Sequence, residues 1–404
     1  MLNTNMQDNC TAGTPTLKGT AALVSEIIQI AQSGLPRMFN AERQLFCFTL
    51  RRDSSGKLVQ EGISHRYTMM TLLGLHRLEV SGTQSPISIG PVMDALTRDL
   101  NWVQFAGDLG VLLWLCAIVD PGRVNGLIKK VDYKESLHRY KDARQRSTTE
   151  LAWILTGLSH AKLAGISCIP EQDRLAESVY ELLKTNQGSH GIFGHMARNG
   201  SWAGRFRGRA GSFADQVYPI YALTYYGRAY GDPEAIRRAR ECAEAIVRLQ
   251  GPQGEWWWHY DAVSGEVSRP YPVYSVHQHG MAPMALHALE EVAGMDFSEA
   301  IDKGLRWIDK QNALDIDMRA SDAGLVWRGI YWNHVWSKSA EMASLYLGTA
   351  PIYEIRNPRI FWECRPYELG WALYAFAGRL ENRENNHTGL ESASAALIWR
   401  SSVS

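Results

Sequence analysis

The sequence predicts an all-α protein, an (α/α)₆ toroid in which helical hairpins form a ring around a central pocket. Three observations favour this class. Apolar, aromatic-rich helical segments recur about every sixty residues, as expected for a repeated supersecondary unit. Amphipathic segments lie between them, so one class of helix is apolar on most sides and the other on one side only. Two of the amphipathic segments end in related turns.

The recurring segments begin with small or polar residues and continue into an apolar helix. Their starts lie at Ser147, Ser212, Tyr274 and Trp336. Helices that contact neighbours on all sides have this composition. We therefore expect them to form the inner ring, with their starts facing the central cavity.

The segments between them have an amphipathic pattern. Residues 232–250 begin with Asp232, a good N-cap, and Pro233, which suits the first helical position. Residues 171–183 and 298–308 show the same single apolar stripe. These segments are expected to form the outer ring.

The remaining elements complete about six hairpins. A helix is expected near residues 20–32, and hairpin-like segments near residues 61–80 and 102–120. Residues 45–51 are predicted to start a short β-hairpin, because Asp53-Ser-Ser-Gly56 has turn chemistry. No other strand is expected.

A single toroid domain is predicted over residues 19–381, because no linker rich in proline, glycine or serine divides the chain. Residues 1–18 are expected to be loose, and residues 382–404 peripheral.

Composition excludes several classes of partner. Lysine plus arginine equals aspartate plus glutamate at 42 each, so no net charge attracts nucleic acid. The apolar run at residues 109–119 is too short to span a bilayer. The N-terminus lacks the pattern of a signal peptide, and the six cysteines form no CxxC pair. We expect a cytoplasmic protein that does not span a membrane.

The two related turns are Q-x₃-G-x-aromatic sequences. One runs from Gln250 through Gly254 to Trp256, and the other from Gln187 to Phe193. The glutamine can satisfy polar backbone groups at a helix end, and the glycine permits a left-handed turn. The aromatic side chain is expected to pack back over the junction.

These turns resemble the QW repeat of terpenoid cyclases and protein prenyltransferase-type toroids, and residues 303–308 resemble the helix before such a repeat. The chemistry of those families does not carry over. The chain has no adjacent Asp-Asp pair, and Asp315-Ile-Asp317 lacks the third acid of a DxDD motif. The zinc prenyltransferase pattern Asp-x-Cys does not occur either.

Residues 254–260 and 274–282 are similar to the helical domain of glucuronyl C5-epimerases and to toroid-type uronate lyases, in which such segments face uronic acids. The whole chain also resembles a bacterial protein family of about this length. This second resemblance implies a carbohydrate substrate.

Polar residues at the starts of the inner helices are the candidates for the site. His277 and His279 can exchange protons near neutral pH, and Tyr274 can donate one. Asp215 and Glu150 begin two other inner helices and complete the predicted catalytic set. The two histidines could also bind a metal, but no third ligand is evident, so no metal or other cofactor is expected.

Substrate binding is assigned to further residues near these starts. A loop rich in glycine and arginine precedes Asp215, and guanidinium groups suit planar anions. Tryptophan rings can stack on sugars or shield a carbocation, although packing between hairpins explains most of them as well. The predicted set is Gln278, Tyr218, Gln216, Trp256, Trp257, Trp258, Arg205, Arg207, Arg66, Arg365 and Glu368.

Three functions remain open. The first is an enzyme that acts on an anionic, uronic acid oligosaccharide by lyase, epimerase or hydrolase chemistry. The second is a terpene cyclase-like enzyme that acts on a prenyl substrate without the usual acidic motifs. The third is a non-catalytic helical scaffold. The first two differ in their cavity walls, because a sugar needs many hydrogen-bonding groups and a polyene needs aromatic walls.

Overall fold

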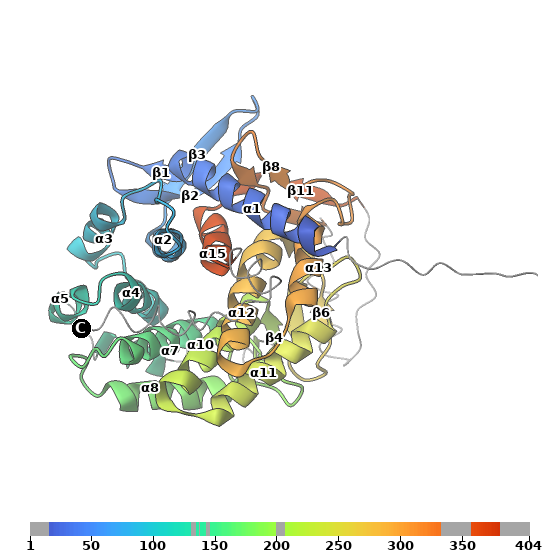
Figure 1. Ribbon diagram of the computed structural model, residues 1–404. Coiled ribbons are helices and arrows are strands. Elements are labelled where there is room, and N and C mark those ends of the chain that lie inside the picture. The colour runs from blue at the N-terminus through green and yellow to red at the C-terminus, as the bar shows by residue number, and fades with distance from the viewer. Residues whose placement is uncertain are drawn as a thin grey trace, which may run out of the picture.

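Two concentric rings of helices alternate along the chain in the computed structural model, which describes residues 16–130, 135–136, 138–142, 146–198, 207–332 and 357–379. In Figure 1 the outer helices surround the inner ones. The inner ring contains α2 (His65–Val80), α4 (Ala106–Val119), α7 (Thr148–Leu163), α10 (Ala214–Tyr230), α12 (Ala282–Ala293) and α15 (Pro366–Phe376). The outer ring contains α1 (Thr16–Gly34), α3 (Ile89–Arg98), α5 (Arg123–Lys130), α8 (Gln172–Lys184), α11 (Pro233–Arg248) and α13 (Ser298–Ile308). Successive inner helices are neighbours and α15 packs against α2, which closes the predicted (α/α)₆ toroid.

The two classes of helix differ in burial as the sequence predicts. In α4 residues 109–117 are buried on every side. In α11 Ala239 and Ile246 face the inner ring, whereas Arg237 and Glu241 form an ion pair at the surface. The predicted N-cap is also present, because the Asp232 carboxylate accepts from two backbone amides in the first turn of α11.

Glycines allow the inner helices to approach closely. A Cβ atom on Gly74 of α2 would lie 2.0 Å from the Gly370 carbonyl oxygen of α15. A Cβ atom on Gly157 of α7 would lie 2.3 Å from the Gly110 carbonyl oxygen of α4. Backbone meets backbone at both contacts, so the inner ring is narrow there.

Aromatic side chains fill the middle of the ring. The rings of Trp114 and Trp371 stack with centroids 5.5 Å apart, and Tyr221 lies 4.9 Å from Trp114. The Trp371 indole donates to the Tyr218 hydroxyl at 3.1 Å. Trp114, Tyr218, Tyr221 and Trp371 thus form an aromatic layer between α4, α10 and α15.

The glutamines of the two related turns connect neighbouring outer helices. Gln250 Nε2 donates to the Gly254 carbonyl at 3.1 Å and to the Ala300 carbonyl of α13 at 2.9 Å. Gln187 Nε2 donates within its own turn and to the Arg238 carbonyl of α11, in both cases at 3.1 Å. The predicted role of these glutamines is confirmed, and each one also binds the next outer helix.

The glycines and aromatic residues of these turns behave as predicted. Gly254 has a φ of 96° and Gly191 a φ of 82°, a conformation that favours glycine. A Cβ atom on Gly254 would also lie 2.1 Å from the Lys303 carbonyl oxygen. Trp256 and Phe193 are fully buried over the junctions. The turns therefore hold the hairpins together.

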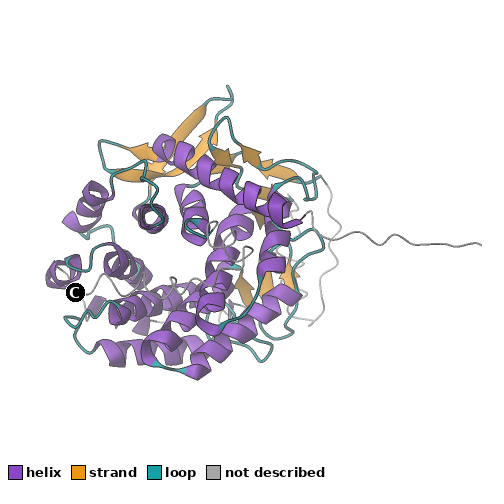
Figure 2. Cartoon of the chain, in the orientation of Figure 1, coloured by secondary structure: helices purple, strands orange, loops and turns teal. Residues whose placement is uncertain are grey.

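Short strands occur in the segments between the helices, and most of them gather along one side of the ring (Figure 2). The predicted hairpin is present as β2 (Leu45–Arg52) and β3 (Leu58–Ile63). The expectation of no further strands is wrong, because loop segments pair in stretches too short to show a period of two. The strands β1 (Phe39–Asn40) and β12 (Glu363–Cys364) pair with β2. A second sheet contains β7 (Val273–Tyr274), β10 (Gly329–Tyr331) and β11 (Arg359–Phe361), and a third contains β4 (Ala210–Ser212), β5 (His259–Asp261) and β6 (Val267–Arg269). The last sheet pairs β8 (Arg319–Ala320) with β9 (Leu325–Val326).

Other predictions differ in extent or fall outside the described residues. The segment predicted near residues 61–80 is divided, because residues 58–63 form β3 before α2 begins. The predicted inner-helix start at Trp336 lies outside the described residues, as do residues 1–15 and 380–404. In the described part of the chain, no helix combines the length and the apolar character needed to cross a membrane.

Candidate active site

Charged side chains from three successive inner helices meet at the amino-terminal end of the ring. Arg66 of α2 donates from Nε to Asp108 Oδ1 of α4 at 2.7 Å. Its terminal nitrogen lies 3.8 Å from Glu150 Oε1 of α7. Asp108 also accepts from the Phe105 amide at 3.2 Å, which holds this carboxylate at the helix start. Arg66 therefore bridges two carboxylates, and its guanidinium lies 4.9 Å from the Trp153 ring.

Glu150 is held in an environment that favours its protonated form. Its side chain is only 12% exposed, and Oε2 accepts from the Gly107 amide at 2.6 Å. A Cβ atom on Gly107 would lie 2.0 Å from that oxygen, so a larger residue at this position would displace the Glu150 carboxyl group. Burial raises the pKa of Glu150 to about 7, because the opposing effect of Arg66 is smaller and the charge of Asp108 adds to the rise. Near neutral pH, Glu150 can therefore act as a proton donor.

A fully buried aspartate at the start of α10 orients a histidine. Asp215 Oδ2 accepts from His195 Nδ1 at 3.1 Å and from the Ser212 amide and hydroxyl at 2.9 and 2.8 Å. Its other oxygen accepts from the Thr149 hydroxyl at 2.8 Å. With Nδ1 donating to Asp215, His195 Nε2 is left to accept from Arg207 at 2.6 Å. An oriented imidazole of this kind is suited to proton transfer.

The electrostatics of this pair favour an ionised aspartate. Burial would raise the pKa of Asp215, but the contacts from His195 and Ser212 lower it. Burial would lower the pKa of His195, but the charge of Asp215 overcomes this and raises it. Glu150 and His195 also act on each other, because the charge of each favours the ionised form of the other. Glu150, His195 and Asp215 thus form one electrostatic group.

A second group of two arginines and two glutamates lies at the amino-terminal end of the ring, near the starts of α2 and α15. Arg328 donates to Glu368 Oε1 at 3.0 Å, and its Nε lies 3.2 Å from Glu363. Arg365, which precedes α15, donates to the Tyr67 hydroxyl at 2.7 Å. Burial raises the pKa of Glu368 to about 7, although Arg328 opposes the rise. These residues therefore form a second, largely buried charged cluster near the starts of α2 and α15.

The two predicted catalytic histidines are buried in the ring wall. His277 and His279 belong to η4 (His277–Met281), a turn of π-helix before α12, and they are 3% and 0% exposed. His277 lies against Phe213, with ring centroids 4.4 Å apart. Burial lowers the pKa of His277 to about 3 and that of His279 to about 4. Both are neutral near pH 7, and their burial leaves no ring face open to a ligand, so we leave them out of the proposed catalytic set.

Of three buried residues predicted to bind substrate, the two glutamines bind backbone groups instead. Gln278 fits its surroundings with Nε2 donating to the Gly254 carbonyl at 2.9 Å and Oε1 accepting from the Trp256 amide at 3.1 Å. Gln216 accepts from the Phe193 amide and donates to its carbonyl at 2.8 and 2.9 Å. Trp256 is fully buried. The two glutamines connect inner helices to the turns, and the burial of all three side chains leaves no surface for a ligand.

The remaining predicted residues have mixed positions. Tyr218 is 4% exposed and packs against Trp153, the residue whose ring also contacts the Arg66 guanidinium. Trp257 donates to a backbone carbonyl at 2.9 Å, which indicates packing. Trp258 and Tyr274 are half-buried neighbours with ring centroids 5.1 Å apart, close to His277, and the guanidinium of Arg328 lies over the Tyr274 ring at 4.7 Å. Arg205 lies outside the described residues.

Sequence reasoning did not select Asp108, His195 or Arg328. Asp108 stands at the start of the most apolar segment of the chain, and a charged residue in a buried helix is a usable signal. His195 lies in a loop after α8, and Arg328 lies between two short strands. No spacing in the sequence connects those loops to the inner helices.

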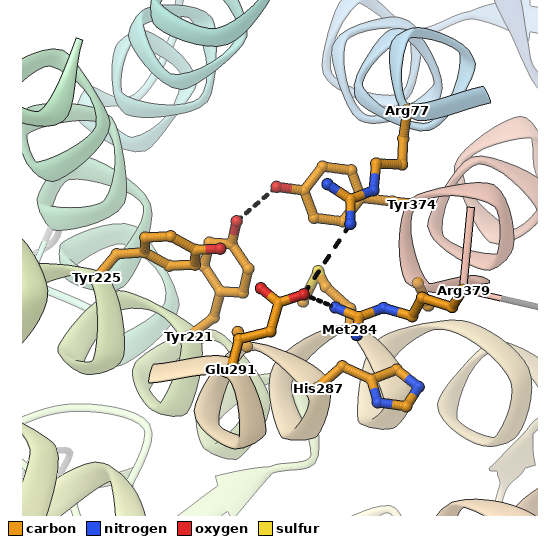
Figure 3. Close-up of a pocket in the computed structure, with 10 residues that line it drawn as sticks. Arg77, Tyr221, Tyr225, Met284, His287, Glu291, Tyr374 and Arg379 are labelled. Atoms are coloured by element: carbon orange, nitrogen blue, oxygen red, sulfur yellow. Dashed lines mark hydrogen bonds and ion pairs between the residues drawn. The ribbon is translucent and has the colours of Figure 1, made fainter. Parts of the chain in front are cut away.

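A separate hollow lies at the carboxyl-terminal end of the ring, beyond the aromatic layer (Figure 3). Glu291 forms ion pairs there with Arg379 and, at 4.0 Å, with Arg77. The hydroxyls of Tyr221 and Tyr374 are 2.5 Å apart. The cavity measures about 20 Å³, which is room for one or two water molecules. It is too small for a sugar. The cluster of Glu150, His195 and Asp215 makes the amino-terminal end the better candidate for an active site.

Comparison by sequence finds no match: no protein-family model matches this chain, and no curated protein matches it either.

Solved structures share the fold at low sequence identity. One is a possible member of the GH105 family from Salmonella enterica serovar Paratyphi A, with a TM-score of 0.58, 11% identity, and coverage of 95% of this chain and 100% of that one. Another is an unsaturated glucuronyl hydrolase specific for heparin, with a TM-score of 0.57, 12% identity, and coverage of 91% and 98%. A third is the unsaturated glucuronyl hydrolase of Bacillus sp. GL1, responsible for the degradation of glycosaminoglycan, with a TM-score of 0.52, 15% identity, and coverage of 91% and 97%. These similarities place the chain among the (α/α)₆ toroids.

Proposed function

We propose that this protein is a glycoside hydrolase that acts on oligosaccharides containing a uronic acid. The observation that carries the proposal is Glu150, a buried carboxyl group with a pKa raised to about 7 beside Arg66 and Asp108. Cleavage of a glycosidic bond requires an acid that is still protonated at the working pH. Glu150 meets that requirement at the amino-terminal end of the ring.

The neighbouring groups supply the other parts of such a reaction. Glu150 donates a proton to the oxygen of the leaving sugar, and His195, oriented by Asp215, accepts a proton from the attacking water. The Arg207 side chain is exposed and donates to the outer nitrogen of that imidazole, so it can move toward an incoming anion. Asp108 fixes Arg66 and raises the pKa of Glu150.

Two further points support a sugar rather than a prenyl substrate. The described wall of this end contains several charged groups with hydrogen-bonding capacity, whereas a polyene pocket has aromatic walls and one isolated acid. The solved structures with the same fold include enzymes described as unsaturated glucuronyl hydrolases. We also propose that the protein is cytoplasmic and that its substrates are short oligosaccharides. Cell fractionation tests the location.

The test is incubation of the protein with unsaturated and saturated uronic acid disaccharides in H₂¹⁸O, followed by mass spectrometry. Hydrolysis adds one ¹⁸O atom to a product, elimination adds none, and epimerisation leaves the mass unchanged. Prenyl diphosphates form a parallel panel. Turnover of prenyl substrates alone would contradict the proposal.

Glu150→Gln is the decisive variant. We expect it to lower kcat by roughly 10²- to 10⁴-fold, the range for loss of a general acid. Glu290→Gln is the matched control, because Glu290 is a largely buried glutamate that pairs with His287 toward the other end of the ring. Full activity of the Glu150→Gln protein would refute the assigned role.

A further inference from the structure

The arginines at the amino-terminal end of the ring differ in how fully their charge is compensated. Arg66 lies 2.7 Å from Asp108 and 3.8 Å from Glu150. Arg209 holds Asp261 with both Nε and a terminal nitrogen, at distances of 2.6 to 2.9 Å. The charge of these two arginines is already balanced by close carboxylates, so they have few donors left for the carboxylate of a substrate.

Arg328 is also compensated. It lies 3.0 Å from Glu368 and 3.2 Å from Glu363, and its side chain is 11% exposed. Arg365 shares the second of these carboxylates, but at the longer distance of 3.5 Å and through the same Glu363 oxygen. Glu363 therefore pairs mainly with Arg328. Glu368 accepts from the backbone amide of Arg365 at 3.1 Å, and the charge of Arg365 acts on it, but Glu368 also pairs with Arg328.

Arg365 keeps unused donors next to the candidate active site. Its side chain is 19% exposed. Its Nε is buried and has no hydrogen-bond partner among the described residues, so the donors available to a ligand are on the terminal nitrogens. One terminal nitrogen donates to the Tyr67 hydroxyl. Tyr67 is close enough to Arg66 to act on its charge, so Tyr67 links Arg365 to the group formed by Arg66, Asp108 and Glu150.

The guanidinium of Arg365 is fixed in orientation as well. It lies 4.5 Å from the Phe48 ring and 5.7 Å from the Tyr67 ring, and Tyr67 itself packs on Tyr367 at 4.4 Å. Aromatic faces hold a planar guanidinium without neutralising it. An oriented, under-compensated guanidinium is the donor geometry that a carboxylate accepts in a bidentate manner.

We propose that Arg365 receives the carboxylate of the uronic acid and so determines the preference for an acidic sugar. This assignment rests on the proposed function and deepens it, because it names the residue that distinguishes a uronic acid from a neutral sugar. Raised protonation of Glu368 near neutral pH would leave this side of the site more positive and add to the effect.

The test compares a uronic acid disaccharide with its methyl ester, which keeps the shape and lacks the charge. In the Arg365→Gln protein we expect kcat/KM for the acid to fall roughly 10- to 100-fold, mainly through KM, as for loss of a charge-assisted hydrogen bond. Activity on the ester is expected to stay unchanged. Arg365→Lys should retain part of the preference, because it keeps the charge and loses the fork.

Arg52→Gln is the matched control, because Arg52 is an exposed arginine over the Trp327 ring. It should leave both substrates unaffected. Equal losses on acid and ester in Arg365→Gln would indicate a structural role and overturn the assignment, as would a retained preference for the acid.

A binding measurement separates failure of this assignment from failure of the proposed function. If no disaccharide is hydrolysed, calorimetric titration with glucuronate still tests Arg365 directly. Binding to the wild type that is lost in Arg365→Gln and kept in Glu150→Gln supports the assignment. Absence of binding to the wild type, or unchanged binding to Arg365→Gln, refutes it.

Discussion

Replacing Glu150 by glutamine changes the stability of the protein in a direction set by the environment of that carboxyl group. The raised pKa means that the folded protein holds the proton more tightly than the unfolded chain does. Between the ordinary value of 4.5 and the raised value of about 7, the native state therefore loses stability as the pH rises. Above pH 7 the buried Glu150 is charged in both states, and folding bears the full cost of its desolvation.

The size of the effect follows from that shift. A change from 4.5 to about 7 corresponds to roughly 3 kcal/mol. Glutamine resembles the protonated acid and can still accept from the Gly107 amide. We expect Glu150→Gln to be more stable than the wild type by roughly 1–3 kcal/mol at pH 8, and the difference to vanish near pH 4.

Urea denaturation of both proteins at pH 4.5, 6 and 8 measures this difference. Glu290→Gln is the control of opposite sign. Burial would raise the pKa of Glu290, but His287 lowers it, so that glutamate contributes stability above its ordinary pKa and its replacement should destabilise the protein at pH 8. A Glu150→Gln protein that is less stable than the wild type at every pH would refute the reasoning.

The remaining predictions concern the same carboxyl group and the turns. Arg66→Met removes a positive charge beside Glu150, which should raise the pKa of Glu150 and move the alkaline limb of the kcat/KM–pH profile up by about one pH unit. Asp108→Asn removes a negative charge and should move that limb to lower pH. Shifts of the same sign in both variants would contradict the geometry. Gly254→Ala places a Cβ atom 2.1 Å from a backbone carbonyl oxygen and should cost roughly 2–4 kcal/mol in urea denaturation. Gly294 also has a positive φ, but a Cβ atom there would meet no atom within 4 Å. Gly294→Ala should therefore lower the free energy of unfolding by only about 1 kcal/mol. Equal losses of stability in the two variants would exclude crowding as the cause.

Much of the fold was predictable because its determinants are local. Burial on all sides or along one stripe is encoded in the composition of each helix, as α4 and α11 show. The Gln250 turn was readable for the same reason, since a helix end, a left-handed glycine and an aromatic residue are close in sequence. The short strands were not predictable, because two or three residues carry no period and their partners come from distant loops.

The candidate site was predictable in position but only partly in membership. Helix starts were expected to face the pocket, and Glu150, Asp215 and Arg66 do meet at that end of the ring. The same reasoning selected His277 and His279, which lie one turn into the ring wall and are buried. Spacing along a helix places a residue near an end, but neighbouring helices decide whether its side chain faces the pocket or packs.

The sequence by itself determined the alternation of inner and outer helices, the turns that connect them, and the end of the ring at which polar residues collect. The tertiary structure alone decided which of those residues act on one another. Asp108 meets Arg66 across 42 positions, and His195 meets Asp215 across 20. The physical reason is that the pKa of Glu150 depends on desolvation and on charges a few ångströms away, which exist only after the ring has closed.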